Sequence, residues 1–283
     1  MTEKRTSVFR RCGDKWLQRK RIVVLSDLHS GHRAGLTPPK YWVEWDRWTP
    51  LQKECWYFYM AKLDLLRPID CLVVNGDMVD GTGTKSGGTE LLSSDMDVQS
   101  DMAAFAIHQA RAPVVKGTFG TGYHTGILMD HEKAVMDKVK LLALEAGREV
   151  ETSLESHMWM DVSGVVFDVK HHIGSSSIPY GKFTAAAKDR FQNLLWAEHE
   201  EQPKADVLIR SHVHYSTMCG EPGEWMAITT PALQAAGTKF GARRCSGPVH
   251  FGLTQIDVFE DGEVYMKMHK TRPIAQKQEA YVL

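Results

Sequence analysis

Residues 22–29 read IVVLSDLH, a continuous apolar run that stops at an aspartate and a histidine. Such a run is typical of a strand that is buried on both faces, with polar residues at its carboxyl end. Residues 71–77, CLVVNGD, repeat this arrangement, and residues 113–117, PVVKG, give a third, shorter example. Amphipathic segments separate the runs, so the first half of the chain has the rhythm of βαβ units.

Helix and hairpin signals complete the pattern. The turns Ser163-Gly164 and Asp261-Gly262 each lie between apolar β-type runs and predict β-hairpins in the second half of the chain. Apolar residues at helical spacing predict helices over residues 51–66, 98–105, 135–142 and 183–195. No proline- or serine-rich linker divides the chain. We therefore predict a single α/β domain, a two-sheet β-sandwich flanked by α-helices in α/β/β/α layers.

The expected domain covers residues 21–271, with an N-terminal extension over 1–20 and a C-terminal tail over 272–283. Two inserts, near residues 31–50 and 81–93, directly follow strand ends that carry polar residues. Loops at the carboxyl ends of strands bind ligands in α/β proteins, so the inserts are candidate substrate walls. The first insert contains three tryptophans, and their packing onto the domain is the alternative interpretation.

Composition excludes several classes of protein. The chain of 283 residues is 43% hydrophobic and 24% charged, with a formal net charge of −1, which is typical of a globular protein without a bulk attraction to nucleic acid. Its five cysteines are scattered, which argues against a disulfide framework or a thiolate zinc site. No apolar run matches a signal peptide or a membrane span. We expect a cytoplasmic protein, or one in the host cytoplasm if phage-encoded, without membrane association; its oligomeric state stays open.

Metal-binding residue types recur after the β-type runs. A single Asp-x-His or His-x-His is usually a solvated turn or an exposed strand face, so the weight lies in the whole set. Because each group follows an apolar run, the fold would gather them at one edge. Aspartate and histidine without cysteine suit Mn²⁺, Fe or Zn²⁺. The groups are Asp27-Leu-His29, Gly76-Asp77, Gly117-Thr118 leading to His124, His171-His172 and His212-Val-His214.

In this order the motifs resemble the signature of the calcineurin-like metallophosphoesterases, D-x-H, G-D, G-N-H, H and G-H-x-H. The resemblance runs from about residue 22 to residue 215, and it includes phage-type members of the family. It implies a hydrolase that cleaves a phosphate ester by a hydroxide bridging two divalent metal ions. Mn²⁺ is the first choice of metal, with Fe, Zn²⁺ or Ni²⁺ as alternatives.

The resemblance also assigns metal ligands residue by residue. Adjacent side chains on a strand point to opposite faces, so only one of His171 and His172 is expected to bind metal. The family pattern favours His171, which leaves His172 for contact with substrate or for solvent. The implied ligands are Asp27, His29 and His214 at the first metal, His171 and His212 at the second, and Asp77 as the bridge that is also needed for catalysis.

One further role follows from the same resemblance, and two others follow from the positions of residues in the sequence. His124 is the candidate catalytic histidine, which would donate a proton to the leaving oxygen or stabilise the charge there. Asp80 follows Asp77 by three residues and is either a partner that orients a ligand histidine or a turn residue. Arg244 is a candidate contact for substrate.

The sequence departs from the family pattern in two places. Gly117 is followed by Thr118 where the family has an asparagine ligand, and Ser211 replaces the glycine before His212. The phage-type pattern G-T-x-x-H-x-G is similar, but from Gly117 the interval to His124 is longer. Either the Thr118 hydroxyl or water would replace the amide oxygen, and either would weaken the second metal site.

The substrate is less constrained by the sequence. Basic loop residues could clamp a second phosphate or a nucleic-acid backbone, and aromatic residues near the inserts could stack on a base. We predict a phosphodiester of a nucleotide or nucleic acid as the substrate, with a phosphomonoesterase or protein phosphatase as the alternative. The missing asparagine also motivates a different class, a catalytically weak scaffold or binding module that retains the fold. The basic residues are Arg33, Lys182, Arg243 and Arg244.

Overall fold

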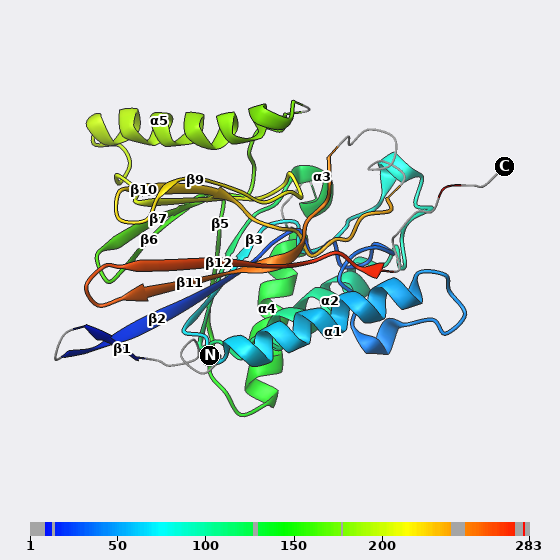
Figure 1. Cartoon of the computed structure of the whole chain (residues 1–283). Coiled ribbons are helices and arrows are strands. Elements are labelled where there is room, and N and C mark those ends of the chain that lie inside the picture. Colours follow the sequence, from blue (N-terminus) through cyan, green and yellow to red (C-terminus); the bar gives the residue numbers. More distant parts are fainter. Residues whose placement is uncertain are drawn as a thin grey trace.

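Two β-sheets packed face to face form the centre of the computed structural model (Figure 1). It describes residues 9–12, 15–126, 130–176, 178–238, 247–274 and 280. The seven-stranded sheet has the order β12-β11-β2-β3-β4-β5, with β1 paired to β2, and the other sheet has the order β6-β7-β8-β10-β9.

The strands of the larger sheet are β1 (Phe9–Cys12), β2 (Lys15–Leu25), β3 (Cys71–Asn75), β4 (Val114–Thr118), β5 (Glu151–Glu155), β11 (Phe251–Phe259) and β12 (Val264–Thr271). Those of the smaller sheet are β6 (Met158–Val162), β7 (Val165–Val169), β8 (Val207–Arg210), β9 (Thr217–Glu221) and β10 (Trp225–Thr229). β2 to β5 run parallel in the larger sheet, as do β7, β8 and β10 in the smaller one. Their carboxyl ends therefore reach the same edge of each sheet.

Helices cover the outer face of each sheet (Figure 1). α1 (Thr49–Leu66), α2 (Met96–His108) and α4 (Asp130–Glu145) lie against the larger sheet, and α5 (Thr184–Glu198) lies against the smaller one. The short elements are α3 (Gly122–Thr125) and the 3₁₀ turns Pro39–Tyr41, Thr84–Ser86 and Pro179–Phe183. Among the described residues, none of the helices has both the length and the apolar character that crossing a bilayer requires.

Alternation along β2 explains the layering. Val23 and Leu25 point into the core under the helices, whereas Ile22 and Val24 point into the core between the sheets. A strand that is buried on both faces has to be apolar at successive positions, as the run over residues 22–25 is. The predicted fold class, an α/β two-sheet β-sandwich flanked by helices in a single domain, is confirmed.

Two features differ from the expected pattern. β2 begins at Lys15 rather than Ile22, because its first residues pair with β1 and, as at Arg19 and Phe259, with the end of β11. In α5 the helix is present, but its apolar stripe points outward: Phe191 is 59% exposed, while Arg190 and Asn193 are buried. Tertiary contacts of polar side chains, here Arg190 and Asn193 with the loop before β8, decide which face is covered.

Candidate metal centre

The loops that follow β2 and β3 are joined at the common edge of the sheets. The backbone amide of Asp27 donates to the carbonyl of Gly76 over 3.1 Å, and that of His29 donates to the carbonyl of Asp77 over 3.0 Å. Gly76 has a φ of 73°, and a Cβ there would lie 2.4 Å from the His171 Nδ1, so glycine is required. These contacts place the ends of the two strands side by side.

The loops of the second sheet reach the same place. The backbone amide of Ser211 donates to the carbonyl of His171 over 2.8 Å, which connects the segments after β8 and β7. The amide of His212 lies 3.3 Å from the Asp27 Oδ2 and donates to it across the two sheets. The predicted ligands from four strand ends are thus neighbours in space.

The backbone at these positions is strained. Positive φ is uncommon for residues other than glycine, and it costs on the order of 1–3 kcal/mol when the surroundings impose it. Such residues cluster at ligand-binding and catalytic sites. Five of the eight described non-glycine residues with positive φ are predicted ligands: Asp27 (49°), His29 (43°), Asp77 (49°), His212 (71°) and His214 (53°).

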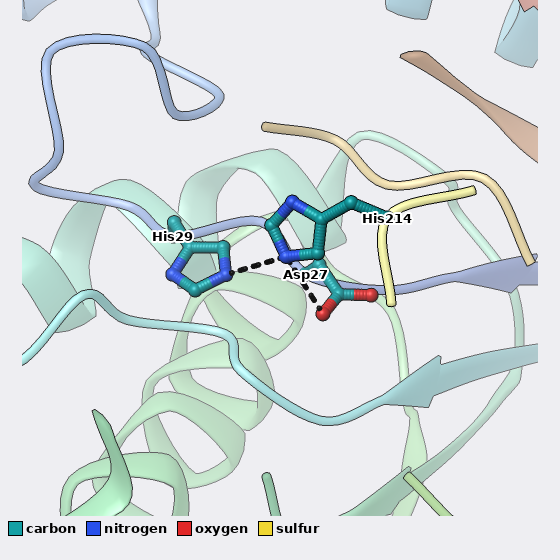
Figure 2. A group of neighbouring side chains, drawn as sticks. All are labelled: Asp27, His29 and His214. Atoms are coloured by element: carbon teal, nitrogen blue, oxygen red, sulfur yellow. Dashed lines mark hydrogen bonds and ion pairs between the residues drawn. The ribbon is translucent and has the colours of Figure 1, made fainter. Parts of the chain in front are cut away.

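One cluster contains Asp27, His29 and His214 (Figure 2). The two imidazole Nε2 atoms lie 3.3 Å apart, and the His214 Nε2 lies 3.3 Å from the Asp27 Oδ1. The Asp27 Oδ1 is buried and accepts no hydrogen bond of good geometry from the described residues. Two ring nitrogens and an unsatisfied carboxylate oxygen that face one another form a donor set suited to a cation.

A second cluster contains Asp77, His171 and His212, whose potential ligand atoms lie within 4.8 Å of one another. The His171 Nδ1 donates to the carbonyl of Asn75 over 2.7 Å, and its Nε2 lies 3.0 Å from the Asp77 Oδ2. A carbonyl that fixes one ring nitrogen and leaves the other facing the site is the usual environment of a metal-binding histidine.

Electrostatics keep the carboxylates of both clusters ionised. Burial alone would raise the pKa of Asp77, but the charge of His171 and its hydrogen bond hold the pKa well below its usual range. Burial likewise opposes ionisation of Asp27, but His214 lowers the pKa of that carboxyl to about 2. Burial lowers the pKa of His171, but Asp77 outweighs it and raises the pKa to about 10. Asp77 and His171 thus stabilise each other's charged forms.

Asp80 holds two histidines at the edge of the first cluster. The His29 Nδ1 donates to the Asp80 Oδ1 over 3.1 Å, which leaves the His29 Nε2 facing Asp27 and His214. The His124 Nδ1 donates to the backbone carbonyl of Asp80 over 2.6 Å. The rings of His29 and His124 lie 4.5 Å apart. Asp80 is thus a partner that orients a predicted ligand histidine, one of the two roles that its spacing allowed.

The loop after β4 wraps around Asp77. The backbone amide of Thr121 donates to the Asp77 Oδ1 over 2.7 Å, and the Thr121 Oγ1 lies 3.2 Å from the same oxygen. A Cβ at Gly120 would lie 2.1 Å from that oxygen, so only glycine permits this approach. Sequence reasoning missed Thr121, although the pattern G-T-x-x-H-x-G fits residues 120–126 without the longer interval.

Glu132 in α4 supports this loop and was also missed. Its carboxylate is fully buried and accepts hydrogen bonds from the backbone amides of Met78, over 3.0 Å, and Gly120, over 2.8 Å. Burial and the charge of Asp77 raise the pKa of Glu132 to about 7. The Glu132 side chain therefore connects Met78, next to Asp77, with Gly120, next to Thr121.

Both departures from the family pattern belong to one buried chain of hydrogen bonds. The Thr118 hydroxyl donates to the Asn75 Oδ1 over 2.6 Å, and the Asn75 Nδ2 donates to the Ser211 Oγ over 2.6 Å. The Ser211 hydroxyl then contacts the Thr230 Oγ1 over 2.7 Å, and Thr230 contacts the Ser26 Oγ over 2.8 Å. Thr118 and Ser211 thus connect the two sheets beneath the clusters.

Of the remaining predicted residues, Arg33 pairs with Asp46 over 2.6 Å, and the Lys182 Nζ lies 4.6 Å from the centre of the Tyr215 ring. The others lie at the rim or outside the described residues. His172 is exposed, and its ring lies 4.8 Å from that of His212. The His124 side chain is 17% exposed and therefore accessible from solvent. Arg243 and Arg244 lie outside the described residues.

Comparison with solved structures finds chains of similar fold and low sequence identity. No family model and no curated protein matches the chain. A solved archaeal phosphodiesterase is 12% identical, with 88% of this chain and 99% of that chain covered and a TM-score of 0.42. Vps29 of Chaetomium thermophilum is 13% identical, with 89% and 95% covered and a TM-score of 0.44. A dimetal phosphatase of Danio rerio is 10% identical, with 87% and 98% covered and a TM-score of 0.44. The chemistry rests on the side chains of this chain.

Proposed function

We propose that the chain is a metal-dependent phosphoesterase whose substrate is a phosphodiester of a nucleotide or nucleic acid. The observation that carries the proposal is the pair of Asp/His clusters at one sheet edge, held by strained backbone. The buried Asp27 Oδ1 accepts no hydrogen bond of good geometry from the described residues, and the Nε2 atoms of His29 and His214 point toward it. This donor set fits a divalent cation such as Mn²⁺ better than it fits a hydrogen-bonded network.

The residues would hold two cations. Asp27, His29 and His214 would bind the first, His171 and His212 would bind the second, and Asp77 would bridge them. When bound, the cations supply Lewis acidity, lower the pKa of water and neutralise phosphate charge. Asn75 and Asp80 fix the Nδ1 side of His171 and His29, so that each Nε2 is presented in its ligating form.

Thr121 is the better candidate than Thr118 for the position of the missing asparagine. The Thr118 hydroxyl already donates to Asn75, whereas the Thr121 hydroxyl lies beside the bridging carboxylate of Asp77. An oxygen at that place can complete the ligands of the second cation or hold water there.

His124 would supply the proton for the leaving oxygen. Its Nδ1 donates to the Asp80 carbonyl, so only Nε2 is free to exchange a proton with substrate. The ring packs against His29, which places it beside the first cluster, and it is open to solvent on one side. Exposed His172, beside His212, would contact the phosphate oxygens from the rim.

The test combines metal analysis with hydrolysis of bis-p-nitrophenyl phosphate and of the corresponding monoester. We expect about two metals per chain, Mn²⁺-dependent cleavage that favours the diester, and at least a roughly 1,000-fold lower kcat/KM in Asp77→Asn. The matched control is Asp137→Asn, which makes the same chemical change at an exposed position of α4. Less than one bound metal and no cleavage that depends on Asp77 would show instead that the chain is a binding module.

A further inference from the structure

A basic groove lies beside the loop that carries His214. His250, Lys270, Thr271 and Arg272 line a surface depression of about 210 Å³. Burial lowers the pKa of His250, and the three charges that act most on it, those of Lys270, Arg272 and Lys182, lower it further because all are positive. The net charge of the whole chain is only −1, so this is a local concentration of cations rather than a property of the entire surface.

Hydrogen bonds connect this groove to the metal centre. The His250 amide donates to the carbonyl of His214 over 2.9 Å, and the His250 Nδ1 accepts from the amide of Ser216 over 2.9 Å. Because Nδ1 accepts a hydrogen bond there, the neutral ring carries its own proton on Nε2, on the other side of the ring. The Lys270 Nζ donates to the Ser216 hydroxyl over 3.1 Å. Two residues that line the groove, His250 and Lys270, therefore contact Ser216, which is two residues after the proposed metal ligand His214.

We propose that the groove binds a second phosphate of the substrate, next to the phosphate that is cleaved, and that the substrate is an oligonucleotide strand. The inference rests on the proposed phosphoesterase function. An imidazole N–H, an ammonium and a guanidinium on one wall are the donors that hold phosphodiester oxygens in register without reading bases. A second phosphate is also present in nucleoside diphosphates, so the test has to separate that source from a strand.

The experiment compares ten-nucleotide oligothymidylate with bis-p-nitrophenyl phosphate, which has no second phosphate. In Arg272→Glu, we expect the ratio of kcat/KM for the oligonucleotide to that for the small diester to fall about 10-fold or more. Lys204→Glu makes the same charge change before β8, at the opposite end of that strand from His212, and should leave the ratio within twofold. Equal losses for both substrates in Arg272→Glu would overturn the proposal.

A binding assay keeps this proposal separate from the proposed function. Fluorescence anisotropy of labelled oligothymidylate in EDTA needs neither metal nor turnover. The proposal is supported, even if no hydrolysis is found, if the strand binds more weakly to Arg272→Glu than to Lys204→Glu. The slope of log K against log salt concentration should also fall by about 1, as expected for the loss of one phosphate contact. Unchanged binding overturns the proposal. ADP is the competitor, at a concentration equal to that of the phosphates of the oligothymidylate. If ADP displaces the oligothymidylate, the groove binds a nucleotide, and the proposal of an oligonucleotide substrate is overturned.

The outer face of α5 supports a second, independent inference. Phe191 and Leu195, one turn apart, are 59% and 43% exposed, and Leu194 and Trp196 flank them at 39% and 43%. In Figure 1, α5 is the outermost element on its side of the smaller sheet, and none of the described helices and strands lies over its outer face. Monomeric proteins rarely expose a contiguous apolar patch of this kind unless it is an interface.

The order of residues on this face is complementary to itself. Lys188, Phe191, Leu195 and Glu198 follow one another at helical spacing. Consider two antiparallel α5 helices that cross at the level of Asn193, with their outer faces in contact. Phe191 would then face Leu195 of the partner subunit, and Lys188 would face Glu198 of the partner subunit. With the exposed parts of Tyr180 (82%) and Phe183 (47%), the apolar area is on the order of 600 Å² at roughly 200 Å² per side chain. A standard interface buries about 800 Å² per partner, so two copies have nearly enough apolar area.

We infer that two copies of the chain dimerise through antiparallel α5 helices. Sedimentation equilibrium of the full chain should give a dimer, and Phe191→Glu should give a folded monomer with unchanged circular dichroism. Lys188→Glu should weaken the dimer, and adding Glu198→Lys should restore it, a rescue that a merely structural role would not give. A wild-type chain that is monomeric at tens of micromolar, or a double variant that is no tighter than Lys188→Glu, would overturn the inference.

Discussion

Two buried clusters of charged residues lie along β2 and just after its carboxyl end, and they differ in whether their charges have partners. Within the strand, the Arg21 Nε and Nη2 atoms donate to the Asp257 carboxylate over 2.7 and 2.8 Å, and its Nη1 donates to the carbonyl of Leu66 over 2.6 Å. Gln255 donates to the same carboxylate over 2.7 Å and accepts from His269. Each of these groups is satisfied by another.

After the end of the strand, the opposite holds. The Asp27 Oδ1 accepts no hydrogen bond of good geometry from the described residues, and the Nε2 atoms of His29 and His214 meet at 3.3 Å. Buried charge that is fully paired has a structural role, whereas ring nitrogens and a carboxylate oxygen that converge without a full set of hydrogen bonds are arranged for a ligand. Burial alone therefore does not separate the two kinds of cluster; the state of each polar atom does.

Loss of a carboxylate at the unsatisfied cluster should have the largest effect, and it should act on activity. We expect Asp27→Asn to lower Mn²⁺-dependent kcat/KM by at least about 1,000-fold, because one anionic ligand of the first cation is lost. Kinetics over a range of Mn²⁺ concentrations measure the effect. Activity within 10-fold of wild type at saturating Mn²⁺ would break the comparison.

Loss of the carboxylate at the satisfied cluster should act on stability instead. In Asp257→Asn the buried Arg21 keeps its charge without an anion, which should lower the free energy of unfolding by about 3–5 kcal/mol. Urea denaturation in EDTA measures this, with Asp137→Asn as the exposed control. If the folded fraction also lost its Mn²⁺ binding, the two clusters would not be independent.

His124 sharpens the comparison within the metal centre, because it touches a ligand histidine but is not proposed to bind metal. We expect His124→Ala to lower kcat about 100-fold for esters with poor leaving groups and less for p-nitrophenyl esters, since it would protonate the leaving oxygen. Metal content should stay at the wild-type level. An equal loss for both kinds of ester would contradict the role as proton donor.

The smallest expected effect separates Thr118, the last residue of β4, from Thr121 in the loop that follows. Thr121→Val should weaken the second metal about 10-fold, which is about 1.4 kcal/mol, because the hydroxyl beside Asp77 is lost. Thr118→Val should leave the affinity within about twofold and lower stability instead, by about 1 kcal/mol, since Asn75 loses a hydrogen bond. Calorimetric Mn²⁺ titration of both variants measures the difference, and the reverse result would restore Thr118 as the ligand.

Much of the fold could be predicted because apolar spacing reports burial directly. Each of the strands β2, β3, β4 and β8 contains a continuous apolar run, over residues 22–25, 71–74, 114–115 and 207–209. The edge at their carboxyl ends follows from the parallel order within each sheet. The edge strands β5 and β9 gave no such signal, because ETSLE and TMCGE are partly exposed and polar.

The site was predictable only in part. The six proposed ligands occupy strand ends, where residue type and position coincide. Thr121 contacts Asp77 through its own backbone amide as well as its hydroxyl, and Glu132 accepts from the amides of Met78 and Gly120, so their residue type alone does not mark them. The orientation of α5 was not predictable either, because an apolar stripe marks a helix face without saying what covers it.

The chain of hydrogen bonds from Thr118 through Asn75 to Ser211 has a consequence for how this sequence can evolve. With glycine at position 211, the Asn75 amide would keep only its longer hydrogen bond, over 3.3 Å, to the Lys170 carbonyl. With asparagine at position 118, the Asn75 carbonyl would face an amide in place of the Thr118 hydroxyl. The two positions are therefore epistatic: we expect a double-mutant coupling of about 1 kcal/mol, which makes reversion at one site costly until the other has changed. The two departures from the family pattern are linked, and neither has to be read as decay of the site.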